Sequence, residues 1–167
     1  MQSKEYSMDV AGFPLTATFT DLADQASGSV IISYRDTTLL ATACMSKNDK
    51  ESDYFPLVVD FEERFYAAGK ILGSQFIRRE GRPSDDAILS GRVVDRTIRP
   101  LFDHRTRREI QVVITTLALG EAKPDTLAVI ASSLALSTSN IPFNGPVSAV
   151  HIGKMDEEFV VNATYAD

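Results

Sequence analysis

Arginine is concentrated in one part of this 167-residue chain, and the concentration predicts a surface that binds a polyanion. Residues 78–108 hold nine of the seventeen basic residues, all of them arginines, against five acidic residues. This window carries a formal charge of +4, whereas the whole chain carries −6. Arginine binds phosphate oxygens through two parallel N–H groups, which lysine does not offer. RNA is therefore the polyanion that we expect.

A glycine-flanked segment at the start of this window combines apolar and basic side chains, in the order QFIRREGR over residues 75–82. In single-stranded RNA binding, aromatic rings stack on bases while guanidinium groups pair with phosphates. The candidate RNA-binding residues of the segment are Phe76, Ile77, Arg78, Arg79 and Arg82. The alternative is that the apolar side chains anchor the segment to the core and the arginines pair with Glu62, Glu63 or Glu80.

Three further arginines are spaced to share one face of a helix. Arg92, Arg96 and Arg99 stand at i, i+4 and i+7. Aligned cations repel one another unless an anion lies among them. That anion is either an RNA phosphate or an internal carboxylate of Asp95 or Asp103, and we include all three arginines among the candidate RNA-binding residues.

Residues able to perform catalysis are few. The histidines are His104, in a charged turn, and His151, inside an expected strand, and both are interpreted as structural or solvated. No Cys/His pattern has zinc spacing and no glycine-rich loop has a nucleotide-binding pattern. Asp85 and Asp86 are explained by helix capping without a metal ion. We therefore expect neither a catalytic residue nor a metal ligand in this chain.

Length and composition predict one soluble domain. With 167 residues, 44% of them hydrophobic, the chain can bury a single core of ordinary density. Cys44, the one cysteine, lies in an apolar run and is expected to be buried in a reducing compartment. No apolar stretch approaches the roughly 20 residues of a membrane helix, so we expect a cytoplasmic protein without a membrane partner.

The elements that position the arginines are expected to be two helices and a sheet. Alternating patterns predict strands over 6–10, 15–19, 29–34, 38–44, 56–61 and 109–119, and a final hairpin with arms over 147–152 and 159–161. Ser84 is a typical N-cap for a helix over 85–98 whose apolar face includes Leu89 and Val93. A second helix over 124–137 is apolar on nearly all sides and belongs in the core.

Three long motifs resemble the first RNase PH-like core of the polynucleotide phosphorylase family. They are FIRREGRPS over 76–84, RVVDRTIRPLF over 92–102 and NIPFNGP over 140–146. The resemblance also covers 55–57 and 66–70 and, more loosely, the whole chain. It implies an α+β fold of the ribosomal protein S5 domain 2-like type, with a mixed sheet packed with helices. Residues 1–145 would form the first core, and 146–167 the incomplete start of its C-terminal subdomain.

The resemblance implies the N-terminal core of a phosphorolytic 3′-to-5′ exoribonuclease, a polyribonucleotide nucleotidyltransferase of mRNA degradation. In that family the full-length protein forms a homotrimeric ring, requires Mg²⁺ and inorganic phosphate, and carries the segment equivalent to Phe76–Arg79 at the entrance of an RNA channel. Ile77 stands here in place of the second aromatic residue.

The family's phosphate-binding serine motif and catalytic aspartates lie in a second core. This chain is therefore expected to be inactive alone, with neither Mg²⁺ nor phosphate bound to it. Two alternatives remain open: a stand-alone non-catalytic RNA-binding or ring-scaffold protein, and a purely structural domain whose arginines make subunit contacts.

Overall fold

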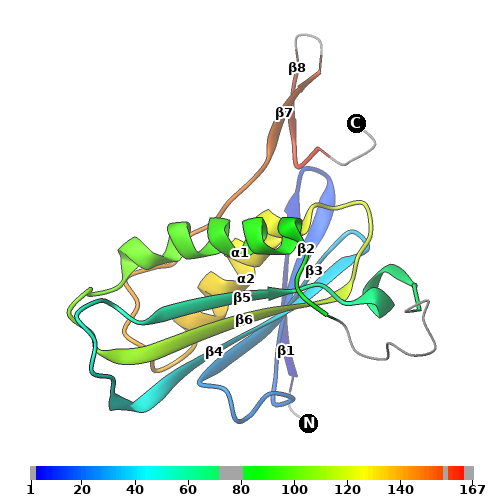
Figure 1. The fold of residues 1–167 in the computed structure, drawn as a ribbon. Coiled ribbons are helices and arrows are strands. Elements are labelled where there is room, and N and C mark those ends of the chain that lie inside the picture. Colours follow the sequence, from blue (N-terminus) through cyan, green and yellow to red (C-terminus); the bar gives the residue numbers. More distant parts are fainter. Residues whose placement is uncertain (1–2, 72–80, 156–157, 164–167) are drawn as a thin grey trace.

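The computed structural model describes residues 3–71, 81–155 and 158–163, in which two helices cover a six-stranded sheet (Figure 1). The strands are β1 (Ser3–Val10), β2 (Phe13–Thr20), β3 (Gly28–Tyr34), β4 (Thr37–Asp49), β5 (Leu57–Glu62), β6 (Arg108–Ala118), β7 (Ile152–Met155) and β8 (Glu158–Val161). The helices are α1 (Asp85–Ile98) and α2 (Pro124–Ser137), with short 3-10 turns η1 (Phe65–Ala68) and η2 (Arg99–Leu101). No helix in these described ranges has the length and apolar character needed to cross a membrane.

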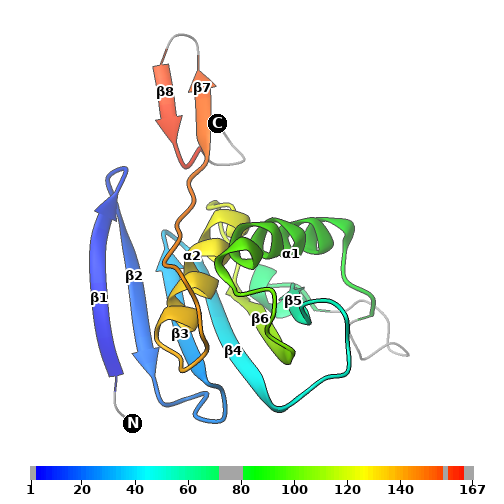
Figure 2. The same cartoon turned by 90° about the vertical axis from the view of Figure 1, so that its left-hand side faces the viewer.

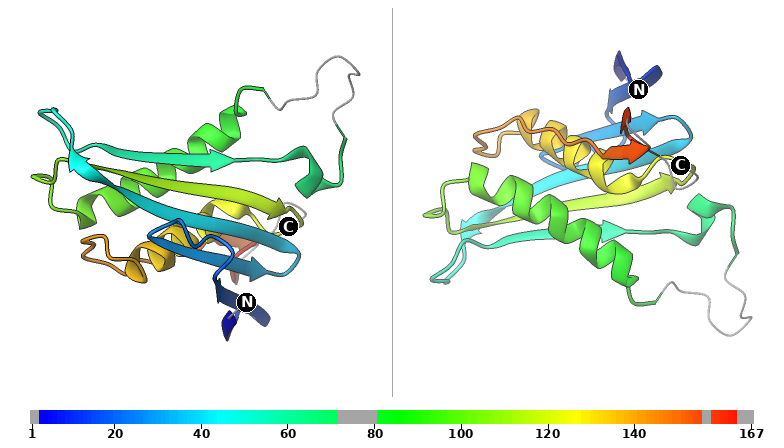
Figure 3. Two further views of the ribbon diagram at one scale, coloured as in Figure 1. Left: turned by 90° about the horizontal axis from the view of Figure 1, so that it is seen from below. Right: turned by 90° about the horizontal axis from the view of Figure 1, so that it is seen from above.

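The large sheet is mixed, as predicted, with the order β1-β2-β3-β4-β6-β5. Its neighbours are antiparallel except for β5, which runs parallel to β6 at one edge. Both helices lie on the same face of the sheet, so the opposite face is open (Figures 2 and 3). This arrangement confirms the expected α+β class.

The core lies between the sheet and the two helices. Ile32, Leu39 and Val112 point into it from the strands and are fully buried. The central position predicted for α2 is confirmed, because most of its side chains are buried. The sequence placed Leu89 and Val93 on the apolar face of α1, but their side chains are 56% and 46% exposed.

The side of α1 that faces the sheet carries small residues. Ala87 and Gly91 are buried there, together with Val94 and Ile98. A Cβ atom built on Gly91 would lie 3.5 Å from the carbonyl oxygen of Val59, so the helix backbone passes close to β5. Leu89 and Val93 stand on the other side of the helix and face outward.

The prediction that Cys44 is buried is wrong. Side chains alternate along β4, where Ala41 and Ala43 face the core and Cys44 points to the open face of the sheet. The apolar run around Cys44 contains residues of both faces, which is why its composition did not indicate the exposure of the thiol.

The strand predicted over 147–152 is also misplaced, because only Ile152 of that range is in β7. Residues 147–150 alternate between half-buried and exposed, but no strand pairs with them. The amide of Val147 donates instead to Ser133 Oγ on α2, at 2.8 Å. The alternation therefore arises from an extended segment that lies along a helix. The division of the chain at residue 145 stays a prediction.

The junction between β3 and the end of α2 offers a test of this packing. We expect Gly28→Ala to lower the free energy of unfolding by about 1–3 kcal/mol, because the added Cβ would overlap the carbonyl oxygen of Ala135 and lie 2.9 Å from Ser139 Cβ. Chemical denaturation measures the change. Gly81→Ala is the matched control, because a Cβ at Gly81 meets nothing within 4 Å. Equal stability of the two variants would contradict the proposed contact.

Candidate nucleic-acid interface

Helix α1 positions the central part of the arginine window and begins where its cap predicts. Ser84 Oγ accepts a hydrogen bond from the amide of Ala87 at 3.0 Å and donates to Glu63 Oε2 at 2.6 Å. Asp85 and Asp86 lie in the first turn, where carboxylates favour the positive end of the helix dipole. The N-terminus of α1 is thereby fixed beside the segment that follows β5.

The arginines of the window that the structure describes are spread over α1 and beyond both of its ends. Helix α1 has 14 residues, which at 1.5 Å per residue corresponds to about 21 Å. Arg82 precedes its first turn, whereas the loop 103–107 follows its far end (Figure 1). The expected residues Phe76, Ile77, Arg78 and Arg79 lie outside the described residues, and their role stays a prediction.

Three arginines have neither a carboxylate nor a carbonyl partner among the residues that the structure describes. Arg82, Arg92 and Arg96 are exposed and have neither a hydrogen bond nor an ion pair to another residue in the described ranges. Arg92 and Arg96 stand one turn apart on the outer side of α1, as their spacing predicts, and Arg82 precedes the helix. We call these three residues the free arginine row. They provide a line of positive charge from the N-terminus of α1 to its last turn.

Arg99 is committed to contacts within the molecule. Its Nε and Nη2 donate to the carboxylate of Asp95 at 2.9 and 2.6 Å. Its Nη1 and Nη2 also reach the carbonyl oxygens of Phe55 and Leu57 at 3.3 and 3.1 Å. The guanidinium therefore satisfies carbonyl groups around the start of β5, which is an edge strand of the sheet. The spacing of the three arginines left open whether they bind an RNA phosphate or an internal carboxylate. Arg99 binds the internal carboxylate of Asp95.

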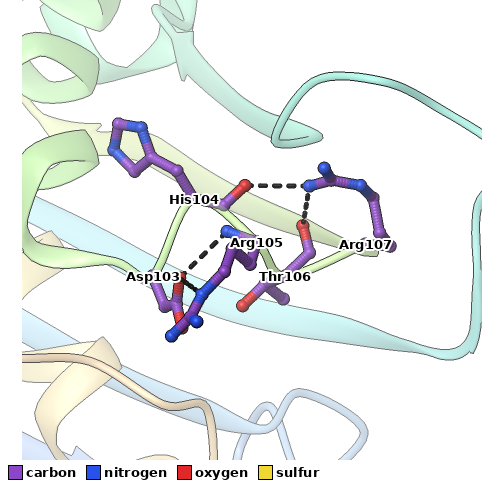
Figure 4. A network of polar contacts seen from close by, with 5 residues as sticks. All are labelled: Asp103, His104, Arg105, Thr106 and Arg107. Carbon is purple, nitrogen blue, oxygen red and sulfur yellow. Dashed lines mark hydrogen bonds and ion pairs between the residues drawn. The ribbon is translucent and has the colours of Figure 1, made fainter.

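The basic loop after η2 also compensates its own charge (Figure 4). Arg105 donates to both carboxylate oxygens of Asp103, with Nη2 3.0 Å from Oδ2. Hydrogen bonds from the Arg105 side chain and amide hold the pKa of the Asp103 carboxyl below its ordinary value. The Nη1 of Arg107 donates to the carbonyl oxygens of His104 and Thr106. This loop therefore offers less uncompensated charge than its composition indicates.

The second histidine joins the C-terminal hairpin to α2. His151 Nε2 lies 2.8 and 2.9 Å from the two carboxylate oxygens of Asp125, and the amide of His151 donates to Asn162 Oδ1 at 3.2 Å. These contacts fit the structural role expected for His151. The described residues contain no group of three or more His, Cys, Asp or Glu that could hold a metal ion.

A hollow beside Arg82 was not predicted. Its volume is about 410 Å³, and it is lined by residues of β5, η1, the segment 81–84 and Leu119, which follows β6. These segments are distant in sequence, and the motif over 76–84 contributes only part of the lining. The prediction that Arg82 binds RNA was the one indication from the sequence that a ligand could bind in this region.

The chain is similar to known proteins over most of its length. Residues 14–142 match the model of the 3′ exoribonuclease family, domain 1 (RNase PH). The polyribonucleotide nucleotidyltransferase of Anoxybacillus flavithermus is 49% identical over 162 residues, which are 96% of this chain and 23% of the relative. That of Brevibacillus brevis is 47% identical over 166 residues, 99% of this chain and 23% of the relative. The chain thus spans about a quarter of the length of these relatives.

Solved structures share the fold at low sequence identity. A chain of the Archaeoglobus fulgidus exosome with RNA bound to the active site matches with a TM-score of 0.64 and 17% identity, covering 98% of this chain and 66% of that chain. Rice Rrp46 matches with a TM-score of 0.68 and 14% identity, covering 99% and 69%. These matches confirm the expected fold type.

The contacts of Arg99 predict a role in stability. We expect Arg99→Ala to lower the free energy of unfolding by about 1–3 kcal/mol, because it leaves Asp95 and two backbone carbonyls without their charged donor. Arg96→Ala, which removes an exposed side chain of the same helix, should change it by less than about 0.5 kcal/mol. Denaturant unfolding compares the two variants. Equal stability would show that the Arg99 contacts are unimportant for the fold.

The Asp103–Arg105 pair predicts a pH-dependent contact. Because the pKa of Asp103 is lowered in the folded chain, the pair is formed at neutral pH and is lost as the pH falls through that lowered pKa. We expect NMR titration of the Asp103 carboxyl to give a higher midpoint in Arg105→Ala than in the unchanged chain. Arg107→Ala, which removes donors to carbonyl groups only, should leave the midpoint in place. An unchanged midpoint in Arg105→Ala would contradict the pairing.

Proposed function

The chain belongs to the 3′ exoribonuclease (RNase PH) family, and from this premise we propose that it is the RNA-gripping first core of a phosphorolytic 3′-to-5′ exoribonuclease. Its relatives are polyribonucleotide nucleotidyltransferases, which supports this class of enzyme. The observation that carries the proposal is the free arginine row, because uncompensated cations on an exposed helix are available to bind phosphates.

RNA phosphates would bind along the outer side of α1. Arg92 and Arg96 are four residues apart on the helix, about 6 Å along the axis, which is close to the separation of consecutive phosphates in a nucleic-acid strand. Arg82 would extend the contact toward the N-terminus of α1. The predicted residues Phe76, Ile77, Arg78 and Arg79 precede Arg82 directly in sequence and would continue the grip with base contacts.

Arg99 takes a different part in this proposal from the one that its spacing predicts. Its guanidinium holds β5 and α1 together, so it would position Arg92 and Arg96 without touching RNA. The phosphate-binding members of the helix are therefore Arg92 and Arg96.

The phosphorolytic step would take place in the larger enzyme of which this core forms a part. The relatives are about four times as long as this chain, so their remaining parts are the proposed place of catalysis, with Mg²⁺ and inorganic phosphate as the cofactor and the attacking substrate. The acidic and histidine side chains of the described residues do not fit a magnesium site, and we propose no metal-dependent step on them. A homotrimeric ring and a cytoplasmic location belong to the same proposal.

Salt dependence tests the RNA grip. We expect single-stranded oligoadenylate to bind less tightly as salt rises, because each neutralised phosphate releases counterions. In Arg92→Ala/Arg96→Ala the slope of log K against log salt should become shallower by about 0.7 for each lost contact. Fluorescence anisotropy of a labelled oligonucleotide measures both quantities.

Arg105→Ala is the matched control for this measurement. It removes an exposed arginine whose charge Asp103 already compensates, so the slope should be unchanged. The proposal fails if the oligonucleotide does not bind, or if the double variant and the control behave alike.

A further inference from the structure

The hollow beside Arg82 has the size and shape of a ligand site. Its volume of about 410 Å³ lies in the usual range for small-molecule pockets, roughly 300–1,000 Å³. The residues that matter for its chemistry are Phe61, Glu63, Phe65, Lys70, Arg82 and Leu119. We call it the η1 pocket, because η1 forms one of its walls.

Backbone and side-chain contacts hold the walls of the η1 pocket together. The amide of Leu119 donates to the carbonyl oxygen of Ala67 at 2.9 Å and ties the end of β6 to η1. The amide of Lys70 donates to the carbonyl oxygen of Phe65 at 2.9 Å and closes the turn after η1. The bond from Ser84 to Glu63 joins the start of α1 to the same wall. The pocket is thus built before any ligand binds.

The electrostatic balance of the η1 pocket favours an anion. Its two carboxylates are both engaged, Glu62 with Arg64 and Glu63 with Ser84. Lys70 and Arg82 are exposed, and no residue in the described ranges forms an ion pair or a side-chain hydrogen bond with either. Two cations therefore remain to attract negative charge.

The other walls of the η1 pocket are apolar. Phe65 and Leu119 are 47% and 39% exposed, so part of each apolar side chain can be reached by a ligand. Phe61 is buried behind them. A ligand that fits both the apolar wall and the two cations has a flat apolar body and an anionic group.

We propose that the η1 pocket binds one nucleotide unit, with the base against the Phe61, Phe65 and Leu119 wall and the phosphate at Lys70 and Arg82. That the bound anion is a nucleotide rests on the proposed function, because Arg82 belongs to both the η1 pocket and the free arginine row. The unit comes either from an RNA strand that follows the row or from a free nucleoside diphosphate. The engaged carboxylate of Glu63 keeps a second oxygen that can accept a ribose hydroxyl.

Calorimetric titration of the full chain with ADP tests the pocket. ADP should bind the unchanged chain. Leu119→Trp fills the pocket and Lys70→Ala removes a cation, so each variant should bind ADP about tenfold more weakly. Leu22→Trp and Lys47→Ala introduce the same changes at exposed positions outside the pocket and should leave ADP affinity unchanged. Thermal unfolding of each variant confirms that the fold is retained. Equal ADP affinity in Leu119→Trp and Leu22→Trp would overturn the proposal.

Competition experiments distinguish the ligand and its source. AMP should displace ADP more effectively than inorganic phosphate does, and equal displacement would overturn the proposal because the base would not be recognised. If oligoadenylate displaces ADP, and if Leu119→Trp weakens the binding of oligoadenylate, the pocket holds a unit of an RNA strand. If oligoadenylate binds without displacing ADP, the pocket holds the free nucleotide.

The two proposals fail in different ways. RNA binding that depends on Arg92 and Arg96, together with no pocket-dependent binding of ADP, would overturn the nucleotide pocket and support the RNA grip. Pocket-dependent binding of ADP without any binding of oligoadenylate would overturn the RNA grip and support the pocket. Arg92→Ala/Arg96→Ala is expected to weaken oligoadenylate binding and to leave ADP binding unchanged.

Discussion

The close packing of α1 against the edge strand β5 determines which residues this domain presents to its surroundings. Gly91 allows the helix backbone to approach Val59, and Arg99 binds carbonyl groups around the start of the same strand. An uncovered edge strand exposes unpaired backbone groups, so this cover also protects the sheet. Because Ala87, Gly91, Val94 and Ile98 face inward, Arg92 and Arg96 face solvent. The position of the free arginine row is a consequence of this packing.

Charge compensation, and not the number of arginines, decides which part of the surface can bind a polyanion. Asp95 and Asp103 engage Arg99 and Arg105, and Arg108 lies 3.6 Å from a carboxylate oxygen of Asp49. Exposed pairs of this kind contribute little to stability, but they reduce the field that a phosphate would meet. The positive charge left over in the described part of the window is therefore that of the free arginine row, whose member Arg82 also lines the η1 pocket.

The sequence contained enough information to predict the strands of the large sheet, the cap at Ser84 and the shared face of Arg92 and Arg96, because these follow from local periodicity and capping chemistry. It did not determine which side of α1 faces the sheet. Side-chain size favoured Leu89 and Val93, whereas the inner face of α1 is formed by Ala87, Gly91, Val94 and Ile98. Nor could spacing reveal that Arg99 reaches Phe55 and Leu57, which precede it by more than forty residues. The η1 pocket depends in the same way on segments brought together only by folding.

The cations and apolar side chains on the described surface fit the proposal that this core contributes binding to the enzyme and that bond breaking belongs to other parts. Cations and an apolar wall hold the substrate and the transition state about equally, and such uniform binding lowers KM without raising kcat. Phosphorolysis also requires groups that stabilise charge developing at phosphorus. In the proposed function, Lys70, Arg82, Arg92 and Arg96 would hold a strand or a nucleotide along α1. A surface of this kind increases the time that RNA stays bound, so its effect on an exonuclease should be greatest for long substrates that reach beyond the reacting nucleotide.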